Sequence, residues 1–120
     1  MEKKITIGSK EFNMKSSAWT SFKYKDETGR TLITDLTELA KKYETTKVDE
    51  ENVLDNFEGL DNFLNTVLRI AYIMAKEGKS TNGNFEEFLM QIDNYLDNTN
   101  WISEVVELAI SPFSRGIQAN

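Results

Sequence analysis

Apolar and polar positions alternate at the start of the chain, which predicts a β-hairpin over residues 3–15. The Gly8-Ser9 pair is a two-residue loop whose first position takes a positive φ at little cost, as a type II′ turn requires. In this register Ile5 lies opposite Phe12, and the two side chains share one face of the hairpin. Because an isolated hairpin is only marginally stable in water, we expect this face to pack against the rest of the chain.

Beyond the hairpin, apolar residues recur every three or four positions, which predicts helices. The Ser16-Ser17 pair offers an N-cap, and Asn84 followed by Glu87 resembles a capping box. Gly78 is expected as the C′ residue of one helix, and Pro112 ends another. The expected helices cover about 17–27, 31–43, 60–77, 85–97 and 101–111. The predicted fold class is α+β and mainly helical, with an N-terminal β-hairpin followed by a bundle of about five helices.

The length of 120 residues suits one domain, which we place at residues 1–112. Residues 44–58 are polar and acidic and are expected to form a connector with room for one helical turn. Residues 113–120 are expected to be a flexible tail. In the helix at 31–43, Ile33 and the leucines are expected to face the core, whereas Asp35 is expected on the opposite, polar face.

The helix at 60–77 has the strongest pattern. Six consecutive residues, from Ile70 to Ala75, are apolar. A helix that is apolar all round is normally buried on most sides, so this segment is either the central helix of the bundle or a place where a partner docks. We prefer the central helix.

Composition excludes several classes of chemistry. The chain has no cysteine and no histidine, so thiolate or imidazole zinc sites, disulfides, cysteine nucleophiles and imidazole-dependent triads are impossible. Paired carboxylates are available, but little sequence remains outside the helix stripes to build a sugar cleft. The acidic stretch from Asp93 to Glu104 fails as a calcium loop, because its third position is Tyr95 and its sixth is Asn98. We therefore expect no enzyme activity, no metal and no cofactor.

Charge is unevenly distributed. Residues 1–47 carry ten Lys and Arg against seven Asp and Glu, whereas residues 48–120 carry four against thirteen, which gives net charges of +3 and −9. An acidic second half repels phosphates, so nucleic-acid binding is not expected. No apolar run is long enough to cross a membrane and no signal-peptide core is present, so a cytoplasmic protein without membrane contact is expected.

Two aromatic features leave alternatives open. Trp19 and Phe22 have the spacing of a buried helix stripe, but with Tyr24 and the lysines at 23 and 25 they also resemble a stacking platform for single-stranded nucleic acid. The core interpretation is preferred. Trp101 is either an anchor for a partner or an aromatic residue that packs the start of the last helix onto the bundle.

Four strings, taken in order, resemble a known family. They are the opening Lys4–Phe12, the segment Trp19–Leu39 with Gly29 before an acidic, leucine-rich helix, the string LRIAYIMAK at 68–76, and FEEFL at 85–89. Together they are similar to the tail assembly chaperones of long-tailed phages and prophages of Gram-positive bacteria, over nearly the whole chain. The chain differs from that pattern in a longer acidic stretch at 49–55 and in Phe88, where a tryptophan is expected.

The resemblance implies a non-enzymatic protein of the bacterial host cytoplasm that is made during tail morphogenesis and is absent from the mature virion. It would bind the tape measure protein, a very long and largely helical chain, keep it soluble, and help to recruit the major tail protein. In that family a programmed frameshift often yields a longer product, which here would diverge after Pro112. Self-association of the chain is left open.

A chaperone of this kind must offer apolar surface while it stays soluble. The expected partner-binding residues are the outward parts of Ile70, Ile73 and Met74, together with Trp101 and Val105 of the last helix. Methionine is flexible and suits a surface that accepts many similar helices. Two other functions remain open: a minor structural tail or head-completion protein, and a small DNA-binding phage regulator.

Overall fold

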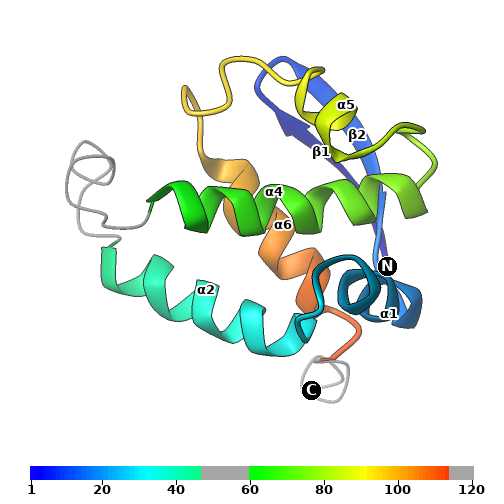
Figure 1. Ribbon diagram of the computed structural model, residues 1–120. Helices are drawn as coiled ribbons and strands as arrows, with labels where there is room; N and C mark the ends of the chain where they lie inside the picture. The colour runs from blue at the N-terminus through cyan, green and yellow to red at the C-terminus, as the bar shows by residue number, and fades with distance from the viewer. Residues whose placement is uncertain (47–59, 114–120) are drawn as a thin grey trace.

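The computed structural model describes residues 1–46 and 60–113 (Figure 1). The chain forms, in order, β1 (Glu2–Ile7), β2 (Lys10–Lys15), α1 (Ala18–Thr28), α2 (Leu32–Thr46), α4 (Leu60–Glu77), α5 (Phe85–Leu89) and α6 (Asn100–Ile110). The predicted fold class is confirmed: a β-hairpin precedes a mainly helical body, with five helices in the described part of the chain.

The hairpin has the predicted register. β1 and β2 are antiparallel with Ile5 opposite Phe12. Gly8 has a φ of 64° and Ser9 is not among the residues with positive φ, which is the pattern of a type II′ turn. The inward side chains of both strands are fully buried, and the strands pack against α4 and α6.

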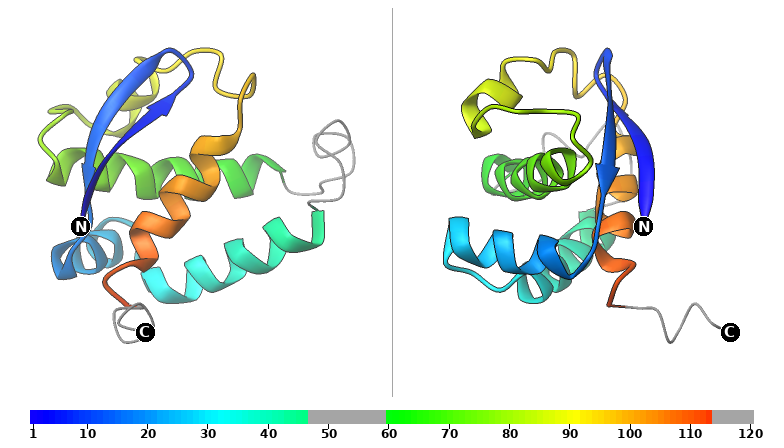
Figure 2. Two further views of the ribbon diagram at one scale, coloured as in Figure 1. Left: turned by 180° about the vertical axis from the view of Figure 1, so that it is seen from behind. Right: turned by 90° about the vertical axis from the view of Figure 1, so that its right-hand side faces the viewer.

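Helix α4 is the centre of the molecule. It contacts β2 and the helices α1, α2, α5 and α6. Figure 2 shows the hairpin and α6 on one side of α4, with α5 at one edge and α1 and α2 at the other. All residues from Ile70 to Ala75 are buried, as expected for an all-apolar helix enclosed by its neighbours.

Several boundaries differ from the prediction or cannot be compared with it. α2 continues to Thr46, into the segment expected to be a connector; the rest of that connector lies outside the described residues, as does the tail from residue 114 on. The helix expected at 85–97 ends at Leu89, although its predicted capping box is present: the Asn84 N–H donates to Glu87 Oε1 and the Glu87 N–H to Asn84 Oδ1, both at 2.8 Å.

The early end of α5 has a long-range cause. After Leu89 the chain forms turns and takes a left-handed conformation at Asn94, with a φ of 49°. This brings Asp93 to the hairpin turn, where its Oδ1 accepts hydrogen bonds from the Ser9 hydroxyl at 2.5 Å and the Ser9 N–H at 3.4 Å. A Cβ added to Gly8 would lie 1.6 Å from the Asp93 carbonyl oxygen, so the loop packs directly on the turn.

Candidate functional site

The five residues expected to bind a partner are in the core. Ile70, Ile73, Met74 and Val105 have no exposed surface, and Trp101 has almost none. The prediction that they face outward is therefore wrong. The hairpin and the other helices enclose α4, and α6, which carries Trp101 and Val105, packs against α4, α2 and β1. The Trp101 indole Nε1–H donates to the Tyr95 carbonyl at 2.7 Å. Of the two interpretations of Trp101, the structure therefore supports the one in which it packs the start of the last helix onto the bundle.

Helix α1 is oriented opposite to the prediction. Its buried residues are Thr20 and Tyr24, whereas Trp19 is 42% exposed and Phe22 is 76% exposed. The core interpretation of the two aromatic residues is wrong. The stacking platform also loses one member, because Tyr24 points into the protein.

Hydrogen bonds from α1 to other helices explain this orientation. At the N-terminus of α1, both Ser17 and Thr20 donate hydroxyl hydrogen bonds to the Glu77 carboxylate at the end of α4, the second at 2.5 Å. Further along, the Tyr24 hydroxyl donates to Asp35 of α2. Buried polar groups need such partners, so Thr20 and Tyr24 form the inner face of α1, whereas Trp19 and Phe22 are exposed.

Asp35 is the centre of a charged cluster between α1 and α2. It is buried, not on the polar face where it was expected. Arg30 Nε lies 2.9 Å from both carboxylate oxygens of Asp35 and an Arg30 terminal nitrogen lies 2.6 Å from Oδ1. With the bond from Tyr24, both oxygens of Asp35 are used.

The cluster shifts two pKa values. Burial alone would raise the pKa of Asp35, but the hydrogen bonds from Arg30 and Tyr24 and the positive charge of Arg30 outweigh it and hold the pKa below its ordinary value. The pKa of Tyr24 is raised by burial first, and then by its bond to Asp35 and the charge of that carboxylate. Asp35 is thus an ionised, buried acceptor for the hydrogen bonds of Arg30 and Tyr24.

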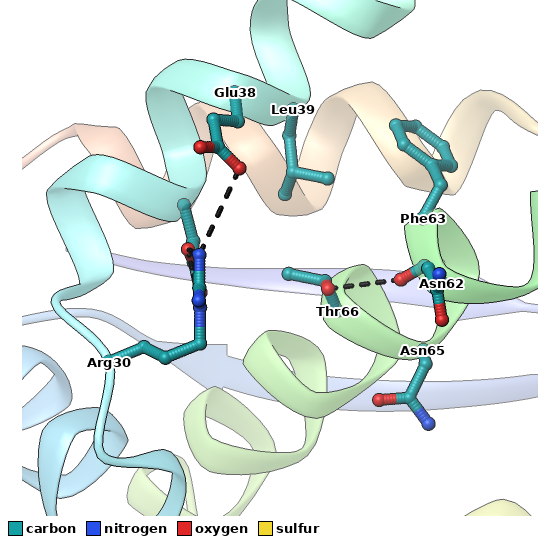
Figure 3. A pocket seen from close by; sticks show the side chains of 8 residues that line it. Arg30, Glu38, Leu39, Asn62, Phe63, Asn65 and Thr66 are labelled. Atoms are coloured by element: carbon teal, nitrogen blue, oxygen red, sulfur yellow. Dashed lines mark hydrogen bonds and ion pairs between the residues drawn. The ribbon is translucent and has the colours of Figure 1, made fainter. Parts of the chain in front are cut away.

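A polar pocket of about 380 Å³ opens beside this cluster, between α2 and α4 (Figure 3). Arg30 and Glu38 line one wall, with their charged groups 3.9 Å apart. The Thr66 hydroxyl on the opposite wall donates to the Asn62 carbonyl at 3.0 Å. The charged side chains that line the pocket are paired with one another, so we assign the pocket no binding or catalytic role.

A second, apolar hollow of about 280 Å³ lies between α1, the start of α2 and Phe113, which comes after the end of α6. Its buried floor is Leu32, and its rims carry Phe22, Ile33 and Phe113, the last two 41% and 44% exposed. These elements lie together at the lower edge of the molecule in Figure 1. We call this site the α1–α2 hollow; it is lined by Ser21, Phe22, Lys25, Thr31, Leu32, Ile33 and Phe113.

The hollow could not be found from the apolar pattern alone, because that pattern assigns Phe22 and Ile33 to buried stripes. A usable signal is the polar series Ser17, Thr20 and Tyr24, whose spacing of three and four residues places three hydroxyl groups on one face of α1. If that face is inward, Phe22 must be outward.

Within the described parts of the chain, no three His, Cys, Asp or Glu side chains are grouped so that they could hold a metal ion. Among the described helices, none has the length and apolar character needed to cross a membrane. Comparison of the chain with protein-family models, with curated proteins and with solved structures gave no match.

Proposed function

We propose that this protein is a phage tail assembly chaperone that binds the tape measure protein in the host cytoplasm, keeps it soluble and helps to recruit the major tail protein. The observation that carries the proposal is the order of the four strings in the sequence, which resembles that family over nearly the whole chain.

The exposed aromatic surface is consistent with a protein-binding role. Trp19 and Phe22 lie one turn apart on α1, and they are available to a partner because the fold does not use them in its core. Because its second half is acidic, the whole chain has a net charge of −6, which favours solubility of a protein that carries an apolar client.

The proposal is tested by capture of partners from cells. Tagged protein is recovered from cells that carry the induced phage, and the retained proteins are identified by mass spectrometry. We expect a very long helical phage protein among them, and we expect this chain to be absent from purified virions. Presence of the chain in mature virions would instead indicate a structural tail or head-completion protein.

A DNA-binding regulator would give a different result: affinity for DNA that falls with salt and is lost when Lys23 and Lys25 are replaced. One structural observation disfavours it, because the Lys23 ammonium is 3.5 Å from the Glu27 carboxylate and its charge is partly neutralised. Recovery of DNA without a phage protein would overturn the chaperone proposal.

A further inference from the structure

We propose that the α1–α2 hollow is the docking site for an amphipathic helix of a partner protein, whose apolar stripe enters the hollow and whose flank carries Asp or Glu. The inference rests on the proposed function in one respect: it takes this helix to belong to the client that the chaperone keeps soluble.

The first step is the concentration of exposed apolar side chains at the hollow. Six large apolar residues are exposed in the described part of the chain. Phe22, Ile33 and Phe113 line the hollow, and Trp19 lies one helical turn before Phe22. Exposed aromatic residues around a pocket are typical of the residues that dominate protein–protein binding energy.

The second step is the size of the hollow. Its volume of about 280 Å³ is just below the range of about 300–1,000 Å³ that is usual for small-molecule sites. A hollow of this size, with Leu32 as its floor, suits one or two apolar side chains that project from a larger partner. The site is therefore a place for anchor residues and not for a metabolite.

The third step is the secondary structure of the occupant. Most of the walls are side chains of α1 and α2, whose backbone groups are hydrogen-bonded within the helices, and the Phe113 N–H donates to the Ile110 carbonyl. A partner strand therefore cannot add to these walls as it would to a sheet edge. A helix presents apolar side chains at intervals of three and four residues, which is the arrangement that a hollow between two helices accepts.

The fourth step is charge. Lys25 is the one charged residue that lines the hollow, and no carboxylate lines it. Among the side chains that the structure describes, that of Lys25 has no ion pair, whereas Lys23 is paired with Glu27 and Arg30 with Asp35. The exposed charge beside the apolar rim is thus positive, and it complements an acidic flank on the partner helix.

The test uses two synthetic helical peptides that share one leucine stripe and differ only in their flanks, which are glutamate in one and lysine in the other. Each labelled peptide is titrated with the full chain and binding is followed by fluorescence anisotropy. We expect the glutamate-flanked peptide to bind about threefold to tenfold more tightly. Phe22→Ser should weaken its binding about tenfold or more, and Lys25→Glu should reverse the preference between the two peptides.

Met90→Ser is the matched control. Met90 is 82% exposed and lies after α5, outside the hollow, so its replacement removes an equally exposed apolar side chain and should leave peptide binding unchanged. Equal loss in the Phe22→Ser and Met90→Ser variants would overturn the proposal, because it would indicate general adhesion. The proposal would also be overturned if the chain did not bind the peptides and Phe22 instead mediated self-association, seen by light scattering, or binding of oligo(dT).

Capture of the tape measure protein by the same variants separates this inference from the proposed function. If the wild-type chain and Phe22→Ser both retain it, the docking site is wrong and the chaperone function stands. If peptide binding follows the expected pattern but no tape measure protein is retained, the chaperone function is wrong and the docking site stands.

Discussion

Asp35 is the residue on which the orientation of α1 most depends. We predict that Asp35→Asn destabilises the protein by about 1–3 kcal/mol at pH 7, because a buried acceptor of charged hydrogen bonds is weakened while Arg30 and Tyr24 remain. Urea unfolding followed by circular dichroism measures this loss.

The stability of the wild type should also depend on pH through Asp35. Because the pKa of Asp35 is lower in the folded state than its ordinary value of 3.8, its contribution to stability is fully present at neutral pH. That contribution is lost as the pH falls below about 4 and through the lower folded pKa. The wild type should therefore lose more stability than Asp35→Asn over this range, and parallel pH profiles would contradict the assignment.

Glu38→Gln is the control for that variant. Glu38 lies on the same helix, is exposed, and is 3.9 Å from Arg30. Surface ion pairs of this kind contribute little, so we expect a change of less than about 0.5 kcal/mol. A large effect at Glu38 would mean that the charge of Arg30, and not the buried acceptor, holds the cluster together.

The same cluster explains why single residues of α1 were misassigned from the sequence. Apolar spacing places Phe22 inward, but Thr20 bonds to Glu77 and Tyr24 bonds to Asp35, which are distant in the sequence. The apolar spacing reflects hydrophobicity alone. It does not indicate which distant carboxylates will accept hydrogen bonds from these hydroxyl groups. The apolar pattern does not predict the α1–α2 hollow for this reason.

At the scale of elements, the C-terminal end of α4 contains a strained backbone conformation that a substitution can relieve. The Ser80 N–H donates to the Ala75 carbonyl and the Lys79 N–H to the Lys76 carbonyl, which is the bonding of a Schellman motif. Its left-handed residue is Lys79, with a φ of 62°, and not Gly78, as the sequence suggested. A side chain in this conformation costs about 1–2 kcal/mol.

We predict that Lys79→Gly stabilises the protein by about 0.5–1 kcal/mol, because relief of the left-handed strain exceeds the added entropy of glycine in the unfolded chain. Thermal unfolding by calorimetry measures the change. Moving the substitution by one position gives the contrast: a Cβ at Gly78 would lie 2.1 Å from the Asn13 carbonyl oxygen, so Gly78→Ala should destabilise. Destabilisation by Lys79→Gly would contradict the strain argument.

The elements that the sequence predicts well are those set by local pattern. The hairpin register follows from alternation and the Gly8-Ser9 turn, and the bounds of α4 agree with the apolar spacing from residue 60 to residue 77. α5 was predicted too long because its end is set by a contact between Asp93 and Ser9, which are 84 positions apart. Apolar residues continue beyond Leu89 at helical spacing, and only the tertiary contact shows that they do not continue the helix.

For the whole molecule, stability and the proposed docking depend on different residues. The fully apolar segment of α4 is enclosed by the hairpin and the other helices, whereas the rim of the α1–α2 hollow is formed by the exposed side chains of Phe22, Ile33 and Phe113. Substitutions in the core should therefore abolish folding, and substitutions on the rim of the hollow should leave folding intact.

The double substitution Ile73→Asp and Met74→Asp tests this separation. Both side chains have no exposed surface, so two carboxylates would be buried without partners. Each costs several kcal/mol, and together they approach or exceed the total stability of about 5–15 kcal/mol that is usual for a domain. We expect loss of the helical circular dichroism signal at neutral pH, while Phe22→Ser retains the wild-type spectrum. A double variant that folds but no longer binds a partner would instead indicate that Ile73 and Met74 lie on the surface, and the enclosed position of α4 would be wrong.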